Sequence, residues 1–325
     1  GLTIDKTSSQ KGLNTDYIIQ WSYDIDETMT LLIPNYKGGA SQSKLSNTSE
    51  TAQKLRENGI QDVEGIMQNT PMPTYWGTQP FTSGPVYAGA IVCFLFVLGL
   101  FLVEGKNKWW LLGATILSIL LAWGKNFLPF TEFFINYIPL YNMFRAVSMT
   151  LVITTFCMAL MASLALKEFF NPDIDKQRKI KALYISGGIV GGITLLFSLV
   201  PQIAGDFKSS SDSMLVSYGY PDFIVNTLTL DRQALLRSDA FRSFAFIALS
   251  ALVLWLYAAK NLKQKFAFTA LALLFLLDLV PIAKRYLNNE HFNEKREGAY
   301  FTPSPADKFI LQDRSQFRVL AMTVD

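Results

Sequence analysis

"FRAVSMTLVITTFCMALMASLALK", residues 144 to 167, carries no charged side chain between Arg145 and Lys167. A helix that crosses a bilayer needs about 20 mostly apolar residues in succession, whereas a core helix of a soluble protein normally presents a polar face to water. The stretch therefore predicts a membrane-spanning helix over residues 146–166, with the permanently charged guanidinium of Arg145 at its start.

The composition of the whole chain points to the same solvent. Half of the 325 residues (50%) are hydrophobic and 17% are charged, against about 25% charged residues in a typical soluble domain. Uncharged stretches of suitable length predict six spans, at residues 83–103, 109–124, 146–166, 182–204, 243–259 and 266–283. A soluble protein with buried core helices would have to explain six such stretches in one chain. The expected fold class is mainly α, a polytopic membrane helix bundle of about six transmembrane helices.

The links between the predicted spans set the expected orientation. The first, third and fifth links are short and basic, and they hold Lys106, Lys108, Lys167, Lys176, Arg178, Lys179, Lys181, Lys260, Lys263 and Lys265. By the positive-inside rule these links face the cytoplasm. The expected organisation is a membrane domain over residues 81–285, an extracytoplasmic segment over 1–80 and the start of an extracytoplasmic domain over 286–325.

Both extracytoplasmic segments are expected to have α/β structure. "DETMTLLIPNYKGG", residues 26–39, is typical of a strand that ends in a Gly-Gly turn, and "NTSETAQKLRENG", residues 47–59, predicts a helix capped by Asn47 and stopped by Gly59. "QFRVLAMTVD", residues 316–325, alternates apolar and polar residues as a half-buried strand does. The sequence begins with Gly1 instead of Met and has no apolar leader, and its last predicted strand has no partner. We therefore expect the chain to continue at both ends in a longer protein.

Few residues of the usual catalytic types are available for an active site. Cys93 and Cys157 fall within predicted spans, so neither a disulfide nor thiol catalysis is expected. His291 is the only histidine, which excludes a multi-histidine metal site and a histidine-based triad within this chain. The glycines of "SGGIVGGITLLF", residues 186–197, repeat at the four-residue spacing that lets another transmembrane helix approach closely.

Ionisable residues at the predicted membrane boundaries are more informative, because each is costly there and by default marks a functional site. They gather on the predicted outer side, where they comprise Lys125, Glu132, Arg145, Arg242 and Asp278. Asp278 is expected to pair with the nearby Lys284 or Arg285.

A further acidic group lies in the predicted outer N-terminal segment. "YDIDET", residues 23–28, contains Asp24, Asp26 and Glu27. An Asp-x-Asp pair can bind a divalent cation, Mg²⁺ or Mn²⁺, that carries a diphosphate, although two acids at this spacing are also common by chance. Asp24 and Asp26 are therefore candidate metal ligands, and a divalent cation is the one cofactor that the sequence indicates.

Four long segments of the sequence resemble those of a known family. They are "WSYDIDETMTLLIPNYKGG" (21–39), "PTYWGTQPFTSGPVYAGAI" (73–91), "LLAWGKNFLPFTEFFINYIPLYNMFRAVSMTLVI" (120–153) and "DRQALLRSDAFRSFAF" (231–246). The chain resembles, over nearly its whole length, the YfhO-type bacterial membrane proteins in the form found in Bacteroidetes. This resemblance implies a bacterial inner-membrane protein related to the GT-C glycosyltransferases, which transfer a sugar from a polyprenyl-phosphate carrier to an extracytoplasmic acceptor.

The resemblance also implies where the chemistry lies. In that superfamily the catalytic carboxylate usually lies in the first outer loop, which here would precede Gly1, and the full-length members are longer than this chain. The 325 residues alone are therefore expected to be inactive, and Glu27 and Asp26 are second-choice catalytic candidates.

Sugar transfer of this kind needs a carboxylate that orients or deprotonates the acceptor hydroxyl and a cation that stabilises the departing phosphate. Arg145 and Lys125 are expected at headgroup depth and are the candidate ligands of the donor phosphate. The aromatic link over 126–144, with Pro129 and Pro139, is expected to form a short interfacial helix between them. The expected partners are membrane lipids, a polyprenyl-phosphate-linked sugar and an acceptor glycan or polymer of the cell envelope, and no nucleic acid.

Two other classes of function stay open. A transporter or lipid flippase also places charges in a helix bundle, but it favours charges near mid-membrane and an internal repeat. No repeat is visible, and the charges gather at one face. A non-catalytic assembly protein is the second alternative, because a family can keep a fold and lose its chemistry.

Overall fold

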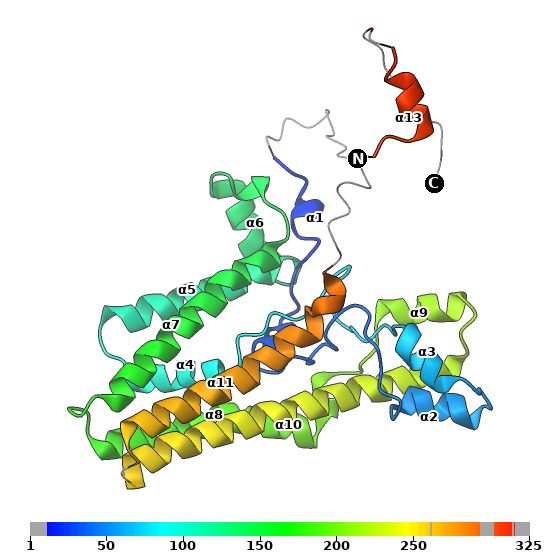
Figure 1. Cartoon of the computed structure of the whole chain (residues 1–325). Coiled ribbons are helices and arrows are strands. Elements are labelled where there is room, and N and C mark those ends of the chain that lie inside the picture. Colours follow the sequence, from blue (N-terminus) through cyan, green and yellow to red (C-terminus); the bar gives the residue numbers. More distant parts are fainter. Residues whose placement is uncertain (1–11, 261, 293–301, 314, 316–325) are drawn as a thin grey trace. The chain divides into compact units, whose positions relative to one another are not determined.

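The computed structural model describes residues 12–260, 262–292, 302–313 and 315, and helices form most of this part of the chain. The backbone separates into two compact units, Gly1–Tyr286 and Leu287–Asp325. The first unit contains α1 (Thr15–Ile18), η1 (Asp26–Leu31), α2 (Glu50–Glu57), α3 (Val63–Asn69), α4 (Ala90–Leu102), α5 (Lys106–Ala122), η2 (Gly124–Phe127), α6 (Leu128–Tyr137), η3 (Tyr141–Met143), η4 (Val147–Thr150), α7 (Leu151–Phe170), α8 (Lys176–Leu199), η5 (Pro201–Ala204), α9 (Ser210–Ser217), α10 (Asp222–Lys260) and α11 (Gln264–Tyr286) (Figure 1). The second contains η6 (Asn289–His291) and α13 (Pro305–Ile310).

Long apolar helices dominate the first unit. Four segments are long and apolar enough to cross a membrane: Val147–Phe170, Lys176–Leu199, Asp222–Lys260 and Gln264–Tyr286. A fifth span exists if the bent pair formed by α5 and the segment that contains α6 is one span. The mainly helical fold is thus confirmed, with several long apolar helices that suit a multi-pass membrane bundle, but the described residues provide four or five such helices where the sequence predicted six spans.

The first predicted span, residues 83–103, is only partly helical. Pro85 and Gly89, which has a φ of 111°, lie in a non-helical stretch, and α4 begins only at Ala90. The helix has 13 residues. At 1.5 Å per residue it is about 20 Å long, shorter than a hydrocarbon core of about 30 Å.

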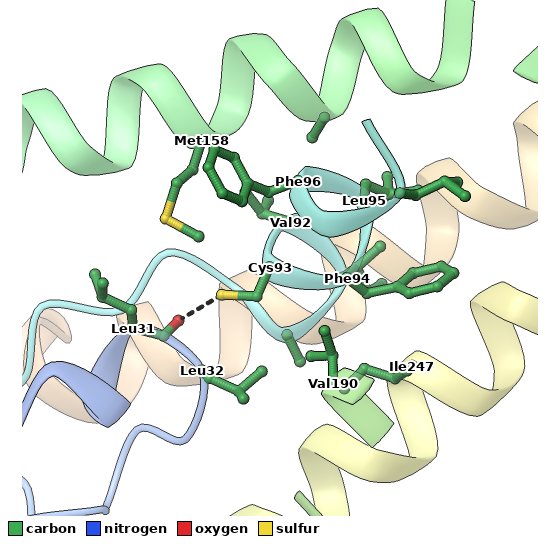
Figure 2. Close-up of a cluster of buried hydrophobic side chains, with 14 of the residues drawn as sticks. Leu31, Leu32, Val92, Cys93, Phe94, Leu95, Phe96, Met158, Val190 and Ile247 are labelled. Atoms are coloured by element: carbon green, nitrogen blue, oxygen red, sulfur yellow. Dashed lines mark hydrogen bonds between the residues drawn. The ribbon is translucent and has the colours of Figure 1, made fainter. Parts of the chain in front are cut away.

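Protein encloses α4 on several sides. Phe94, Leu95 and Leu98 are each 0% exposed. Figure 2 shows the side chains of α4 beside residues of the N-terminal segment, α7, α8 and α10, namely Leu31, Leu32, Met158, Val190 and Ile247. The Cys93 thiol donates a hydrogen bond of 3.3 Å to the carbonyl oxygen of Leu31 (Figure 2). The N-terminal segment and the membrane helices therefore share one hydrophobic core.

The second predicted span ends in a sharp bend. α5 and the segment Gly124–Tyr137 meet at 109°. Gly124 has a φ of 46° and Pro129 lies in the first turn of α6, so a straight helix cannot continue through this point. The short helix expected within 126–144 is present as α6, and its Phe133 and Tyr137 are exposed.

The three basic links meet at one end of the bundle, called here the basic end. Arg178 in the first turn of α8 forms a 2.7 Å ion pair with Glu104 in the link that follows α4. Phe170 at the end of α7 stacks on Phe268 near the start of α11, with 4.4 Å between ring centroids. This common end agrees with the alternation of basic links along the sequence. The opposite end, where α8 finishes at Leu199, is called the far end.

The prediction of a strand within residues 26–39 is wrong. Residues 26–31 form the 3-10 helix η1, and no strand occurs among the described residues, which contain only an isolated bridge between Ser43 and Met72. Leu31, Leu32 and Ile33 are all buried, so the run lacks the alternation of buried and exposed side chains that a half-buried strand requires. The α/β structure expected for this segment is therefore not supported. The C-terminal strand predicted over 316–325 lies outside the described residues.

The surface helix expected within 47–59 is confirmed as α2, with a different cap. The side chain of Ser49, and not that of Asn47, accepts a hydrogen bond of 3.1 Å from the backbone N–H of Ala52. Gly59, just past the helix, has a φ of 78°, the left-handed conformation that favours glycine at this position.

The glycines of α8 line an apolar groove beside its contact with α10. The groove has a volume of about 330 Å³ and is lined by residues of both helices. A Cβ atom placed on Gly188 or Gly192 would meet no atom within 4 Å, and one on Gly191 would lie 3.7 Å from Ile247, an ordinary contact. Within the described chain, these glycines are not needed for close packing.

Candidate functional site

A groove at the far end of the bundle brings acidic and apolar side chains together. Its volume is about 760 Å³, within the range of about 300–1,000 Å³ that is typical of small-molecule sites. This acidic groove is lined by Asp24, Ile25, Asp26, Met29, Tyr36, Asn126, Ile193, Leu196 and Phe197. The last three belong to α8. One wall is therefore an apolar membrane helix, and the other carries two carboxylates and an amide.

Asp24 is held at the groove by uncharged donors from two other segments. Its carboxylate accepts hydrogen bonds from the hydroxyl of Thr78 at 2.6 Å, from the backbone N–H of Thr78 at 3.1 Å and from the side-chain amide of Asn126 at 3.3 Å. Asn126 lies in η2, immediately after α5, and also donates to the carbonyl oxygen of Tyr23 at 2.8 Å. The bend after α5 therefore helps to fix the position of Asp24.

Glu27 lies behind the groove and is only 2% exposed. Its carboxylate accepts hydrogen bonds from the hydroxyl of Tyr75 at 2.8 Å, from the side-chain amide of Gln79 at 3.0 Å and from the backbone N–H of Asp24 at 3.3 Å. Burial raises the pKa of Glu27 to about 7, because desolvation of the charged carboxylate outweighs these hydrogen bonds. Glu27 therefore ties the turn at Asp24 to the loop that contains Tyr75 and Gln79.

Asp26 faces the groove and pairs with a lysine that sequence reasoning missed. Its carboxylate lies 2.8 Å from the ammonium of Lys37, and the Asp26 side chain is 43% exposed whereas that of Lys37 is 8% exposed. The ammonium also lies 3.8 Å from the ring centroid of Trp76, a cation–π contact. Lys37 lies in a stretch that the sequence assigned to a strand and turn, so no sequence signal identified it.

Lys125 and Arg145, the predicted phosphate ligands, lie in different surroundings. The Lys125 ammonium is 3.4 Å from the carbonyl oxygen of Thr78, the residue that binds Asp24, but Lys125 itself does not line the acidic groove. Arg145 donates to the hydroxyl of Tyr17 at 2.5 Å, and its guanidinium lies 5.5 Å and 5.8 Å from the ring centroids of Tyr17 and Trp21. Arg145 is not among the residues that line the groove.

Buried ion pairs fasten the N-terminal segment and the long helices together. Asp278 pairs with Arg242 at 3.1 Å, and not with Lys284 or Arg285 as the sequence predicted. Arg285 pairs with Asp239 at 2.7 Å instead. Asp239 also accepts from the backbone N–H of Asn35, so this pair reaches the N-terminal segment.

A third pair, between Arg232 and Asp212, lies 2.6 Å apart where α10 meets α9. Arg232 is 0% exposed and also donates to the carbonyl oxygens of Phe207 and Pro73. All three pairs join residues 20 or more positions apart in the chain.

The predicted metal ligands, Asp24 and Asp26, have separate partners in the structure. Asp24 is hydrogen-bonded to Thr78 and Asn126, whereas Asp26 is paired with Lys37. Within the described ranges, no group of three or more His, Cys, Asp or Glu residues is placed to hold a metal ion. A divalent cation at Asp24 and Asp26 stays a prediction.

The fold and the groove define a class, a multi-pass membrane helix bundle with a partly acidic groove at one end. Compared with models of known protein families, with curated proteins and with solved structures, the chain matches none.

Proposed function

We propose that the chain forms part of a bacterial inner-membrane glycosyltransferase that binds a polyprenyl-phosphate-linked sugar in the acidic groove. The observation that carries the proposal is the division of this groove between an apolar helix wall and a polar wall with two carboxylates. A lipid-linked sugar has the same two halves, since an isoprenoid chain prefers the apolar wall and sugar hydroxyls donate hydrogen bonds to carboxylates.

In this proposal Asp24 and Asp26 act on the sugar or on the acceptor hydroxyl. A carboxylate takes the proton of the acceptor hydroxyl, the acceptor oxygen forms a bond to the anomeric carbon of the sugar, and the bond from that carbon to the phosphate oxygen breaks. The bonding electrons leave with the polyprenyl phosphate, whose negative charge a nearby cation stabilises. Lys125, whose ammonium lies 3.4 Å from the carbonyl oxygen of Thr78, is one candidate for this cation.

Glu27 is a positioning residue in this proposal and not a catalytic residue. Its carboxylate is buried behind the groove and accepts hydrogen bonds from Tyr75, Gln79 and Asp24. The proposed orientation places the far end of the bundle, with both ends of the chain, outside the cytoplasm, since the basic links then face inward.

The experiment uses the purified full-length protein in lipid nanodiscs, supplied with a radiolabelled polyprenyl-phosphate sugar, and measures release of polyprenyl phosphate. Asp24→Asn and Asp26→Asn are expected to lower turnover by about 100-fold or more, the usual effect of losing a general base. Asp173→Asn is the matched control, because Asp173 is exposed and lies between α7 and α8 at the basic end. Wild-type turnover in both groove variants would remove the proposed site.

The same preparation separates the two alternative classes of function. A flippase moves the intact lipid-linked sugar from one leaflet of a vesicle to the other without releasing polyprenyl phosphate. An assembly protein neither moves nor cleaves it. Either result contradicts the proposed transfer reaction.

A further inference from the structure

Lys37 is a buried cation immediately behind the wall of the acidic groove. The residue is 6% exposed, although lysine is rarely buried without an anionic partner. Its backbone is fixed, because its carbonyl oxygen accepts a 3.0 Å hydrogen bond from the N–H of Trp76. The next residue, Gly38, has a φ of 85°, and a Cβ atom there would collide with the carbonyl oxygen of Thr74.

The ammonium of Lys37 is held by one carboxylate and one aromatic ring. Asp26 lies 2.8 Å away, and the ring centroid of Trp76 lies 3.8 Å away. An ammonium group has three N–H donors, and a single carboxylate oxygen with a π face leaves it able to bind a further acceptor. The carboxylate that binds it is also the part of the pair that is accessible, since the Asp26 side chain is 43% exposed and lines the groove.

We propose that Lys37 binds the phosphate of the lipid-linked donor, and that Asp26 keeps the ammonium in place while the groove is empty. This inference rests on the proposed function, because it assigns a residue to the phosphate of that donor. A phosphate that reaches the groove beside Asp26 offers the ammonium several oxygens and a charge at least equal to that of the carboxylate. It therefore competes with Asp26 for Lys37.

The assignment differs from the one that the sequence predicts. Arg145 contacts Tyr17 and Trp21, neither of which lines the groove, whereas Lys37 pairs with Asp26, which does. Lys125 is exposed, so solvent screens its charge. Lys37 is desolvated, and a desolvated cation attracts a phosphate more strongly than an exposed one does.

The test measures binding of polyprenyl phosphate, without a sugar, to the full-length protein in nanodiscs, and compares it with binding of the uncharged polyprenol. Lys37→Met is expected to weaken binding of the phosphate by about 10-fold or more, the scale of a charge-assisted hydrogen bond, and to leave binding of the polyprenol unchanged. Asp26→Asn is expected to tighten binding of the phosphate by about 3- to 10-fold, because it removes a competing anion. Asp26→Asn is thus expected to raise the affinity for polyprenyl phosphate and to lower the turnover of the lipid-linked sugar.

Two control variants accompany the test. Lys54→Met removes a lysine that also pairs with a carboxylate, Glu57, at 2.8 Å, but both side chains are exposed on α2. Arg145→Ala removes the arginine that the sequence alone assigns to the phosphate. Both controls are expected to bind polyprenyl phosphate as the wild type does.

Two results would overturn the assignment of Lys37. One is an unchanged phosphate affinity in Asp26→Asn, a variant that keeps Lys37 and removes only a half-exposed carboxylate. The other is loss of phosphate affinity in Arg145→Ala with none in Lys37→Met. If Lys37→Met fails to fold, Lys37→Gln and Asp26→Asn still decide the question. Because no sugar is present, phosphate binding through Lys37 can be established even if the transfer reaction proves absent.

Discussion

A single buried carboxyl group, that of Glu27, is expected to make the stability of the groove region depend on pH. Its pKa rises from the ordinary value of 4.5 to about 7 in the folded chain. Between these two values the folded state binds more protons than the unfolded state, so stability is greatest below pH 4.5 and falls as the pH rises to about 7. The contribution lost is roughly 3 kcal/mol.

The measurement is the apparent melting temperature of the detergent-solubilised protein between pH 4.5 and 8. Glu27→Gln is expected to reduce the fall in melting temperature over this window, because the amide does not titrate. Glu57→Gln, on the exposed face of α2, is the control and is expected to keep the wild-type dependence. Identical pH profiles for wild type and Glu27→Gln would contradict the role assigned to burial.

The buried pair of Asp278 and Arg242 leads to a second prediction at the level of single residues. Asp278 is 0% exposed and also accepts a 2.6 Å hydrogen bond from Tyr87. Arg242→Met leaves this carboxylate buried without its cation and is expected to cost about 3 kcal/mol or more. Arg178→Met, which breaks an exposed pair with Glu104, is expected to cost less than about 1 kcal/mol.

Chemical unfolding in mixed micelles gives both free energies. The double variant Arg242→Met with Asp278→Asn is expected to recover part of the loss, since the uncompensated charge is gone. If the single and double variants are equally stable, the unpaired charge of Asp278 does not cause the loss of stability.

Sequence reasoning at this level found the acids of the groove and missed their partners. Asp24 and Asp26 stand out by their Asp-x-Asp spacing, and both line the groove. The partners of Asp26 and Asp278, Lys37 and Arg242, are 11 and 36 positions distant in the chain. Folding, and not spacing along a helix, brings these pairs together.

At the level of elements, the glycines of two helices are expected to respond differently to a methyl group. A Cβ atom on Gly99 of α4 would lie 2.8 Å from the side chain and 3.1 Å from the backbone oxygen of Met161 in α7. Gly188 of α8 has no atom within 4 Å of that position. Gly99→Ala should therefore destabilise the bundle, whereas Gly188→Ala should be neutral or stabilise it by about 0.5–1 kcal/mol through helix propensity.

The comparison is read from thermal unfolding of the two variants in the same detergent. Gly192→Ala, which also meets no atom within 4 Å, repeats the test on α8. A large loss of stability in Gly188→Ala or Gly192→Ala would mean that another helix occupies this face in the assembled protein.

The positions of the helices were more predictable than their forms. Uncharged runs located a helix at each predicted span, because the hydrophobic period and the absence of charge are local properties. The short α4 and the bend after α5 depend on Gly89, Gly124 and Pro129, whose effect depends on their position relative to the helix ends. At the end of η1, three successive apolar residues, Leu31, Leu32 and Ile33, are buried in the core that contains α4, which a strand-like alternation does not predict.

At the level of the whole molecule, the common position of the three basic links leads to a prediction about topology. Single cysteines are introduced at Ser210, which precedes α10, and at Asp173, between α7 and α8. Both positions are exposed, whereas the native Cys93 and Cys157 are buried. A membrane-impermeant thiol reagent added to intact cells is expected to label Ser210→Cys and not Asp173→Cys.

Permeabilised cells provide the control, since both introduced cysteines should then react. Labelling of Asp173→Cys in intact cells would contradict the assigned orientation. It would also move the acidic groove to the cytoplasmic side, because the groove lies at the end opposite the link between α7 and α8.

The enclosure of α4 has a consequence for biosynthesis. The membrane helices that contact α4, namely α7, α8, α10 and α11, all follow it in the chain. During translation this helix of 13 residues must therefore wait at the translocon, or under the protection of an insertion chaperone, until α7 at least has been synthesised. A chain that ends after α5 lacks the membrane helices that later enclose α4, so such truncated chains are expected to be degraded by quality-control proteases before longer ones are.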